Sequence, residues 1–366
     1  MSANLRFPPL PTIRDLLKLY RLQARKQLAQ NFLMDERLTN KIIKQAGHIE
    51  GSQVIEVGPG PGGLTRSIMK KLPEKLIVIE KDLRFKPTLE MLAETFSSIN
   101  GNMSIIYDDI MRTNLEKNLS DNFKKEWNDK CPKINIIGNL PFNVSTPLII
   151  NWLNDISEKK GAWSMGRVRL LLTFQKEVAE RIVAAPLNDQ RCRLSLMSQA
   201  WTNPRLRFII PGKAFIPKPD VDVGVVTFEP LSVPRTTHEF KLFEKISRHL
   251  FAFRQKFSRT CIKTLFPPDV TEEMTMMMFK LSDLDPEMRP MQFTVEDVDK
   301  LCSAYKYLVE QHPGLDEYNY RASKKVLSKN YTIHVNVTDL DEAFGQQQDE
   351  IVYEKIDNSD RFLINK

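Results

Sequence analysis

The sequence predicts an α/β fold, in which a mainly parallel sheet is followed by a small α-helical domain. Three observations predict it. Short apolar runs alternate with helical stretches through the first half, glycine, acidic or amide residues follow four of these runs, and the pattern is helical after residue 237. Strands that alternate with helices form a parallel sheet covered on both faces. Such sheets bind ligands at the carboxyl ends of their strands.

The strands are predicted from apolar runs that end at turn residues. Four runs in the first half are Gln53–Val57, Leu76–Ile79, Met103–Tyr107 and Lys133–Ile137. Val168–Thr173 is the fifth expected strand. Leu206–Ile210 and Val223–Phe228 are expected to form a closing hairpin, joined by the loop Pro211–Asp222.

The remaining elements are predicted to be helices and connecting segments. The expected helices are Leu64–Leu72, Glu239–Phe253, Lys256–Leu265, Glu272–Leu281 and Val295–Val309. Pro230–Thr237 is interpreted as a linker, and the Met274–Phe279 stretch as core packing rather than a cofactor site. The chain is therefore divided into a basic N-terminal segment (1–27), an α/β domain (28–232), a helical domain (238–312) and a polar, partly disordered tail (316–366). Within the tail, Tyr331–Val337 can form an isolated strand.

Composition narrows the class of protein. Of the 366 residues, 42% are hydrophobic and 27% charged, which is typical of soluble globular proteins, and no apolar run reaches the roughly 18 residues of a membrane-spanning helix. The net charge of +7 suits a polyanionic partner. The four cysteines are far apart and have no histidine at metal-ligand spacing, so neither a disulfide framework nor a metal site is expected.

The basic N-terminal segment has two interpretations. It contains six basic residues and a single acid, Asp15, and leucines recur among them at near-helical spacing. Such a basic, amphipathic start is typical of an organelle transit peptide. The alternative is the first helix of the folded protein, beginning after Pro11. Both can hold if import does not require removal of the whole segment.

A glycine-rich turn between the first strand and its helix indicates a nucleotide-cofactor site. Gly58, Gly60 and Gly63 satisfy the G-x-G-x-x-G spacing, which lets the backbone approach a ligand closely. Glu80 ends the next strand and can accept both hydroxyls of a ribose. Asp109, at the third strand end, can accept from an adenine amino group, and the neighbouring Asp108 is an equally acidic alternative. These features fit NAD and S-adenosylmethionine alike, but the prolines within the turn lack the N–H groups that a pyrophosphate needs, which favours S-adenosylmethionine.

The segment after the fourth strand selects the chemistry. Adenine N6 is a poor nucleophile because its lone pair is delocalised into the ring. The side-chain oxygen of Asn139 and the carbonyl of Leu140 can accept its two hydrogens, while Phe142 stacks on the base. The lone pair is then free to face a methyl sulfonium. The positioning of N6 against the methyl group accounts for most of the catalysis, so no activating metal is needed.

Two further segments fit a base-modifying site. Gln30 to Leu33, after a basic helix, can close over the cofactor. Phe215 lies in a proline-rich loop and can form the second wall of a base pocket opposite Phe142. Aromatic walls of this kind help to offset the unstacking of a target base.

Together these motifs identify a family resemblance. QNFL, EVGPGPGGLT, VIEKD, DDIM, NLPFN and FIPKPDVDVGVV occur in this order and closely resemble the ribosomal RNA adenine N6-dimethyltransferases, the family of bacterial KsgA and eukaryotic Dim. The resemblance covers roughly Leu10 to Leu308. Within the family the chain is most similar to the mitochondrial members, through LPTIRDLLKLYRLQARKQLAQNFL, STPLIINWL and LTFQKEVAERI.

The resemblance implies more than the residues do alone. It implies a Rossmann-like class I methyltransferase domain with a mainly parallel seven-stranded sheet, and a helical domain that helps to bind RNA. It implies a monomer in the mitochondrial matrix that dimethylates two adjacent adenosines in a hairpin loop near the 3′ end of small-subunit rRNA and supports assembly of that subunit.

The resemblance also assigns roles to residues at matching motif positions. S-adenosylmethionine would contact Leu33, Gly58, Glu80, Lys81, Asp109, Ile110 and Asn139. The target adenine would be held by Asn139, Leu140, Phe142 and Phe215, and RNA would be gripped with the help of Arg248, Arg254, Lys256 and Arg259. Three positions depart from the family pattern: Phe142 replaces tyrosine, Asp108 replaces glycine and Gly224 replaces serine. The second departure puts the shape of the Asp109 loop in question.

Two other functions compete with this interpretation. Relatives of this fold serve as transcription factors that assist mitochondrial RNA polymerase at promoters, and a basic surface suits melted DNA as well as RNA. An NAD-dependent oxidoreductase would need a histidine or a tyrosine–lysine pair for hydride transfer, and no such constellation is evident among the residues.

Overall fold

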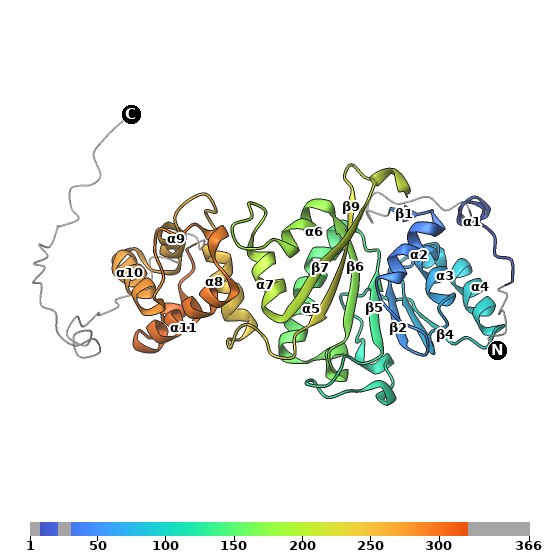
Figure 1. Cartoon of the computed structure of the whole chain (residues 1–366), viewed down its shortest axis with the longest axis horizontal. Helices are drawn as coiled ribbons and strands as arrows, with labels where there is room; N and C mark the ends of the chain where they lie inside the picture. Colours follow the sequence, from blue (N-terminus) through green and yellow to red (C-terminus); the bar gives the residue numbers. More distant parts are fainter. Residues whose placement is uncertain (1–7, 21–30, 321–366) are drawn as a thin grey trace, which may run out of the picture.

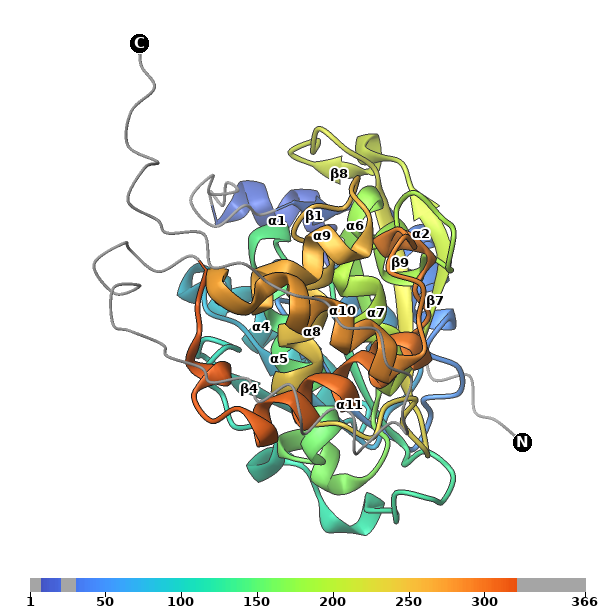
Figure 2. The same cartoon turned by 90° about the vertical axis from the view of Figure 1, so that its left-hand side faces the viewer.

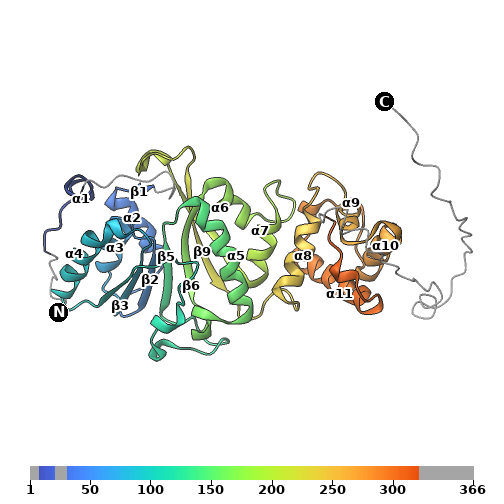
Figure 3. The same ribbon diagram turned by 180° about the vertical axis from the view of Figure 1, so that it is seen from behind.

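The computed structural model describes residues 8–20 and 31–320. Figure 1 shows a central twisted sheet with helices on both sides and a bundle of helices beyond its end. The same arrangement seen from behind in Figure 3 places α5 in front of the sheet. The described ranges exclude Gln30, the tail segment Tyr331–Val337 and all the residues before Pro8.

The strands form one large sheet and one small one. Their bounds are β1 Phe32–Leu33, β2 Gln53–Val57, β3 Lys75–Ile79, β4 Met103–Ile106, β5 Ile134–Gly138, β6 Arg169–Gln175, β7 Thr202–Ile210, β8 Phe215–Ile216 and β9 Val223–Pro230. Within the described residues the large sheet has seven strands in the order β4-β3-β2-β5-β6-β9-β7, and β1 pairs with β8.

The helices alternate with the strands and then continue alone. Their bounds are α1 Ile13–Leu19, α2 Glu36–Lys44, α3 Gly63–Met69, α4 Lys86–Ser97, α5 Phe142–Glu158, α6 Lys176–Val183, α7 Arg193–Trp201, α8 Phe240–Leu250, α9 Ser258–Ile262, α10 Thr271–Ser282 and α11 Val295–Gln311. None of the described helices is both long and apolar enough to cross a membrane.

The sheet topology confirms the predicted fold class. Strands β2 to β6 run parallel to one another, and β9 and β7 close the edge in antiparallel fashion. The buried strands are almost continuously apolar, as is usual when helices cover both faces of a parallel sheet. All five parallel strands therefore end at the same edge of the sheet, which is where the ligand loops are predicted.

Each face of the sheet has its own apolar cluster. Helices α2, α3 and α4 cover one face with side chains such as Ile43, Ile68 and Leu89. The other face packs against α5, α6 and α7 with side chains such as Trp152 and Leu196. Gly224 in β9 belongs to this packing, because a Cβ at that position would collide with Ala179 of α6. The close approach of α6 explains why glycine replaces serine here.

The helical region after β9 shares its core with the α/β domain. Trp201 of α7 lies 5.1 Å from the ring of Phe240 and 5.3 Å from that of Phe243, both in α8. The guanidinium of Arg191, only 1% exposed, donates to the carbonyl of Phe293 at 2.8 Å, just before α11. The apolar cluster therefore runs without a break from α5 to α11. Met274, Met278 and Phe279 are buried within it, which confirms the predicted role of that stretch.

The strand expected to begin at Leu206 begins at Thr202, and two further sequence predictions were wrong in detail. The loop Pro211–Asp222 contains β8, which pairs with β1 through Phe32↔Ile216 and Leu33↔Phe215. The helix expected to begin at Lys256 begins at Ser258, because the N–H groups of Ser258 and Arg259 bond to the carbonyls of Met288 and Pro286. Both differences arise from partners far away in the sequence.

Candidate active site

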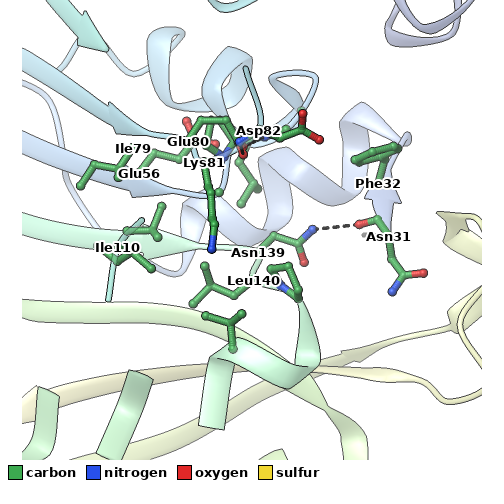
Figure 4. Close-up of a pocket in the computed structure, with 18 of the residues that line it drawn as sticks. Asn31, Phe32, Glu56, Ile79, Glu80, Lys81, Asp82, Ile110, Asn139 and Leu140 are labelled. Atoms are coloured by element: carbon green, nitrogen blue, oxygen red, sulfur yellow. Dashed lines mark hydrogen bonds between the residues drawn. The ribbon is translucent and has the colours of Figure 1, made fainter. Parts of the chain in front are cut away.

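A cavity of about 300 Å³ opens at the carboxyl ends of the parallel strands. The loops after β2, β3, β4 and β5 line it from the sheet side, and residues of β1 and β8 line it from above. Figure 4 shows Glu80, Lys81, Ile110 and Asn139, from the ends of three different strands, around the same space. The residues predicted to bind ligands therefore lie together at this edge, because the strands are parallel and in register.

The glycine-rich turn forms one wall of the cavity. Gly58 and Gly60 have φ angles of +67° and +54°, which favour glycine. A Cβ at Gly60 would also come within 3.3 Å of the Phe32 ring. The turn therefore approaches β1 too closely for a side chain, and its backbone faces the cavity.

Glu80 connects the ends of β2 and β3. One carboxylate oxygen accepts the N–H of Gly60 at 3.0 Å, and the other accepts the N–H of Asp82 at 2.7 Å. Burial raises the pKa of this carboxyl, which is 7% exposed. Each oxygen retains a further lone pair, so Glu80 can hold the glycine turn and still accept from a ligand hydroxyl.

Lys81 and Asp109 form an ion pair beside the cavity, with 2.7 Å between Nζ and Oδ2. The hydrogen bond from Lys81 lowers the pKa of Asp109. Asp108, which replaces the family's glycine, accepts the N–H of Asp109 at 2.7 Å through its side chain. This bond closes the turn, so the departure preserves an ordered loop. Ile110 follows it and also lines the cavity.

The turn after β5 places an amide at the cavity floor. Asn139 Nδ2 donates to the carbonyl of Asn31 at 3.4 Å (Figure 4), and its Oδ1 accepts from the hydroxyl of Thr173 at 2.8 Å. Leu140 and Phe142 follow, and both line the cavity. Phe142 begins α5, so helix and turn hold the aromatic ring next to the amide.

Phe215 lines the same cavity, although it is far along the sequence from the other lining residues. Its pairing with Leu33 brings β8 over the carboxyl ends of the strands, and its side chain is only 2% exposed. The cavity therefore brings together every described residue that was predicted to contact the cofactor or the target base. Gln30 lies outside the described residues, and Arg248, Arg254, Lys256 and Arg259 belong to the helical region.

One residue of the cavity was missed by sequence reasoning. Glu56 lies in the middle of buried β2 and is 1% exposed, and burial raises the pKa of its carboxyl to about 8. The side chain and the backbone N–H of Thr65 oppose this rise, but less strongly than burial promotes it. The sequence signal was an acid within a buried strand, two residues before the first glycine of the turn. Such a carboxyl is neutral at neutral pH, and a cationic ligand beside it would favour its ionised form.

The cavity has no metal-binding group. Among the described residues, no three histidine, cysteine, aspartate or glutamate side chains are placed to hold a metal ion. The cavity does contain a glycine turn whose backbone a ligand can approach closely, a carboxylate at a strand end, an amide and two aromatic rings. This combination suits a nucleoside-bearing cofactor on one side and a planar base on the other.

Comparison with known proteins gives the same assignment. A family profile described as "Ribosomal RNA adenine dimethylase" matches residues 21–296. The chain is 49% identical over 325 residues to "Dimethyladenosine transferase 1, mitochondrial" of Drosophila pseudoobscura pseudoobscura, covering 88% of this chain and 94% of that protein. It is 48% identical over 329 residues to the protein of the same name from Homo sapiens, covering 90% and 94%.

Solved structures share the fold. A dimethyladenosine transferase from Plasmodium falciparum superposes with a TM-score of 0.56 at 20% identity, covering 75% of this chain and 98% of that one. The 23S rRNA methyltransferase ErmE superposes with a TM-score of 0.52 at 16% identity, covering 75% and 100%. At these identities the likeness concerns the fold alone.

Proposed function

The chain belongs to the ribosomal RNA adenine dimethylase family, and we propose that it dimethylates N6 of two adjacent adenosines in a hairpin loop near the 3′ end of mitochondrial small-subunit rRNA. Membership makes it an S-adenosylmethionine-dependent methyltransferase. The naming of its relatives as mitochondrial supports a site of action in the mitochondrial matrix, on the assembling small subunit. We propose that the protein acts as a monomer, with one chain supplying the residues assigned to the cofactor and to the base.

The residues of the cavity fit S-adenosylmethionine, which supplies, when bound, a methyl group carried on a positively charged sulfur. Glu80 is suited to the ribose hydroxyls and Asp109 to the adenine amino group. The backbone of Gly58 and Gly60 allows close approach, while Leu33, Lys81 and Ile110 border the same space. The buried carboxyl of Glu56 borders the same space and would be ionised more readily beside a cationic ligand.

The observation that carries the proposed reaction is the placement of Asn139 at the end of β5. Its Oδ1, together with the carbonyl of Leu140, would accept the two N6 hydrogens of the target base. The nitrogen lone pair would then be withdrawn from the ring and directed at the methyl carbon. Phe142 and Phe215 border the same cavity and would stack on the flipped base from its two sides.

The helical region supplies a surface that would hold the RNA. Arg254 and Lys256 are exposed on the connection between α8 and α9, and neither forms an ion pair within the described part of the chain. Phe253 and Phe257 flank them and are 48% and 40% exposed. Cations interleaved with exposed aromatic rings suit an RNA backbone with unpaired bases. Arg248 and Arg259 belong to the same basic surface, although Arg259 also approaches Glu287 at 3.5 Å.

The test is methyl transfer from labelled S-adenosylmethionine to a small-subunit hairpin with two adjacent adenosines. We expect dimethyladenosine in the hydrolysed RNA, and we expect Asn139→Ala to reduce transfer at least a hundredfold while cofactor affinity, measured by calorimetry, changes far less. Near-normal turnover by Asn139→Ala would contradict the assigned role. Cofactor binding without transfer to the wild-type hairpin would instead favour a function in binding DNA and mitochondrial RNA polymerase.

A further inference from the structure

Asn139 is held by a residue that does not line the cavity. Thr173 lies in β6, next to β5 in the sheet, and the pairing of Gly138 with Leu172 brings it beside Asn139. Its hydroxyl donates to Asn139 Oδ1 at 2.8 Å, and the residue is 1% exposed. Leu172 and Phe174 on either side of it are fully buried and apolar.

The hydroxyl is not explained by the stability of the strand. A buried hydroxyl costs free energy unless it is hydrogen-bonded, and valine has the same branched shape without that cost. The backbone of Thr173 already pairs with Val225 of β9. What the hydroxyl adds is a donor aimed at one atom of the amide on the cavity floor.

The direction of that bond matters because an amide has two different ends. Oxygen accepts hydrogen bonds and NH₂ donates them, and a half-turn about the last side-chain bond exchanges the two. Thr173 donates to Oδ1 from one side, and the carbonyl of Asn31 accepts from Nδ2 on the other. The reversed amide would place NH₂ against the Thr173 hydroxyl and oxygen against the Asn31 carbonyl, so two acceptors would meet.

We propose that Thr173 is a positioning residue, which keeps the Asn139 oxygen in place to accept from the amino group of the target adenine. This inference rests on the proposed function. Oδ1 has two lone pairs, so one can accept from Thr173 while the other accepts from N6. Without the hydroxyl, the amide is held only by the longer bond to Asn31, and a larger fraction of molecules presents NH₂ to a group that also donates.

The experiment compares Thr173→Val, which removes the hydroxyl, with Thr173→Ser, which keeps it. Single-turnover methyl transfer is measured at saturating cofactor and RNA, beside the affinity for S-adenosylmethionine by calorimetry and the melting temperature. We expect Thr173→Val to slow transfer about tenfold, as the loss of one such bond in the transition state would do. Cofactor and RNA affinities should stay within about twofold, and Thr173→Ser should transfer within about threefold of wild type.

A matched control is Thr275→Val in α10. Thr275 is also fully buried and its hydroxyl also makes a hydrogen bond, to the carbonyl of Thr271, but it lies in the helical region. Its transfer rate should equal that of wild type. A wild-type rate for Thr173→Val would overturn the inference. So would an equal loss in Thr173→Ser, or a fall in cofactor affinity that matches the fall in rate, because either would point to packing.

The two proposals can fail separately. If the wild-type protein makes no dimethyladenosine in the hairpin, the proposed function fails before Thr173 is tested. If wild type is active and Asn139→Ala is not, but Thr173→Val is normal, only the positioning role fails.

Discussion

At the scale of single residues, Glu56 makes the stability of the protein depend on pH. Burial raises the pKa of its carboxyl from 4.5 to about 8, so between these values the folded protein holds a proton that the unfolded chain has lost. Stability contributed by this proton is present at low pH and falls as pH rises toward 8, by up to about 1.4 kcal/mol per pH unit. We expect the melting temperature of the ligand-free protein to decrease from pH 5.5 to 8 for this reason.

Glu56→Gln is the matched variant, because it has the same shape and cannot ionise. Its melting temperature should vary less over this pH range than that of wild type, and the two curves should separate most near pH 8. Thermal melts at constant ionic strength measure the difference. Parallel curves for the two proteins would contradict a raised pKa for Glu56 in the folded protein.

The residues that sequence reasoning found and those that it missed differ in where they lie along a strand. Glu80, Asp109 and Asn139 follow apolar runs, so their position at a sheet edge could be predicted from the alternating pattern alone. Glu56 and Thr173 lie inside such runs, where a polar residue carries no local signal of its partner. Finding them requires the strand order, because Thr173 reaches Asn139 only through the β5–β6 pairing.

At the scale of elements, α1 links the N-terminal segment to the cofactor loop. The carbonyl of Pro11 accepts from Arg66 Nη1 at 2.7 Å, and Arg66 lies in α3, the helix that begins at Gly63. Leu16 is 1% exposed, whereas Leu19 on the same helix is 70% exposed. Thr12 caps the helix by accepting the N–H of Asp15 at 3.2 Å. These contacts favour the interpretation of residues 11–19 as a helix of the folded enzyme.

The two leucines provide a test with an internal control. Leu16→Ala should lower the free energy of unfolding by about 2 to 4 kcal/mol, because it removes a buried side chain. Leu19→Ala should change stability by less than about 0.5 kcal/mol. Denaturant unfolding and calorimetry measure both. Equal behaviour of the two variants would mean that α1 is dispensable and would support the transit-peptide interpretation.

The ends of a strand or helix were predictable where the local sequence pattern determines them. β2 has the predicted bounds, because an apolar run ends there at glycine. The strands β1 and β8 have only two residues each and exist because they pair with one another. The start of α9 depends on carbonyls near residue 287, which no local pattern reveals.

At the scale of the whole molecule, alternating periodicity predicted the sheet and the change to a helical pattern predicted the second region. Their junction was not predictable. Trp201, Phe240 and Phe243 form one cluster across it, so the helical region is fixed against α7 rather than joined by a free linker. In Figure 1 the connection between α8 and α9 lies on the same edge of the molecule as β1 and β8, and the turned view in Figure 2 agrees.

This fixed geometry gives the last prediction. An RNA hairpin whose target base enters the cavity would pass the exposed cations Arg254 and Lys256, and each phosphate contact releases counterions. Replacing both residues by glutamate should weaken RNA affinity at least tenfold near physiological salt. The slope of log affinity against log salt should become shallower by about one for each cation removed. Cofactor affinity should not change, because the cavity has none of these residues in its lining.

The control for this charge reversal is Lys71→Glu with Lys130→Glu, which changes the net charge by the same amount. Both lysines are exposed and precede β3 and β5, at the edge of the sheet opposite the cavity. If RNA is held by the α8–α9 connection, only the first pair alters the salt slope strongly. If both double substitutions weaken RNA binding equally, RNA responds to the overall charge of the protein, and the helical region has no specific RNA-binding surface. The measurement therefore distinguishes two cases. Either the RNA follows a defined path between the cavity and α9, or it is attracted by the basic surface in general.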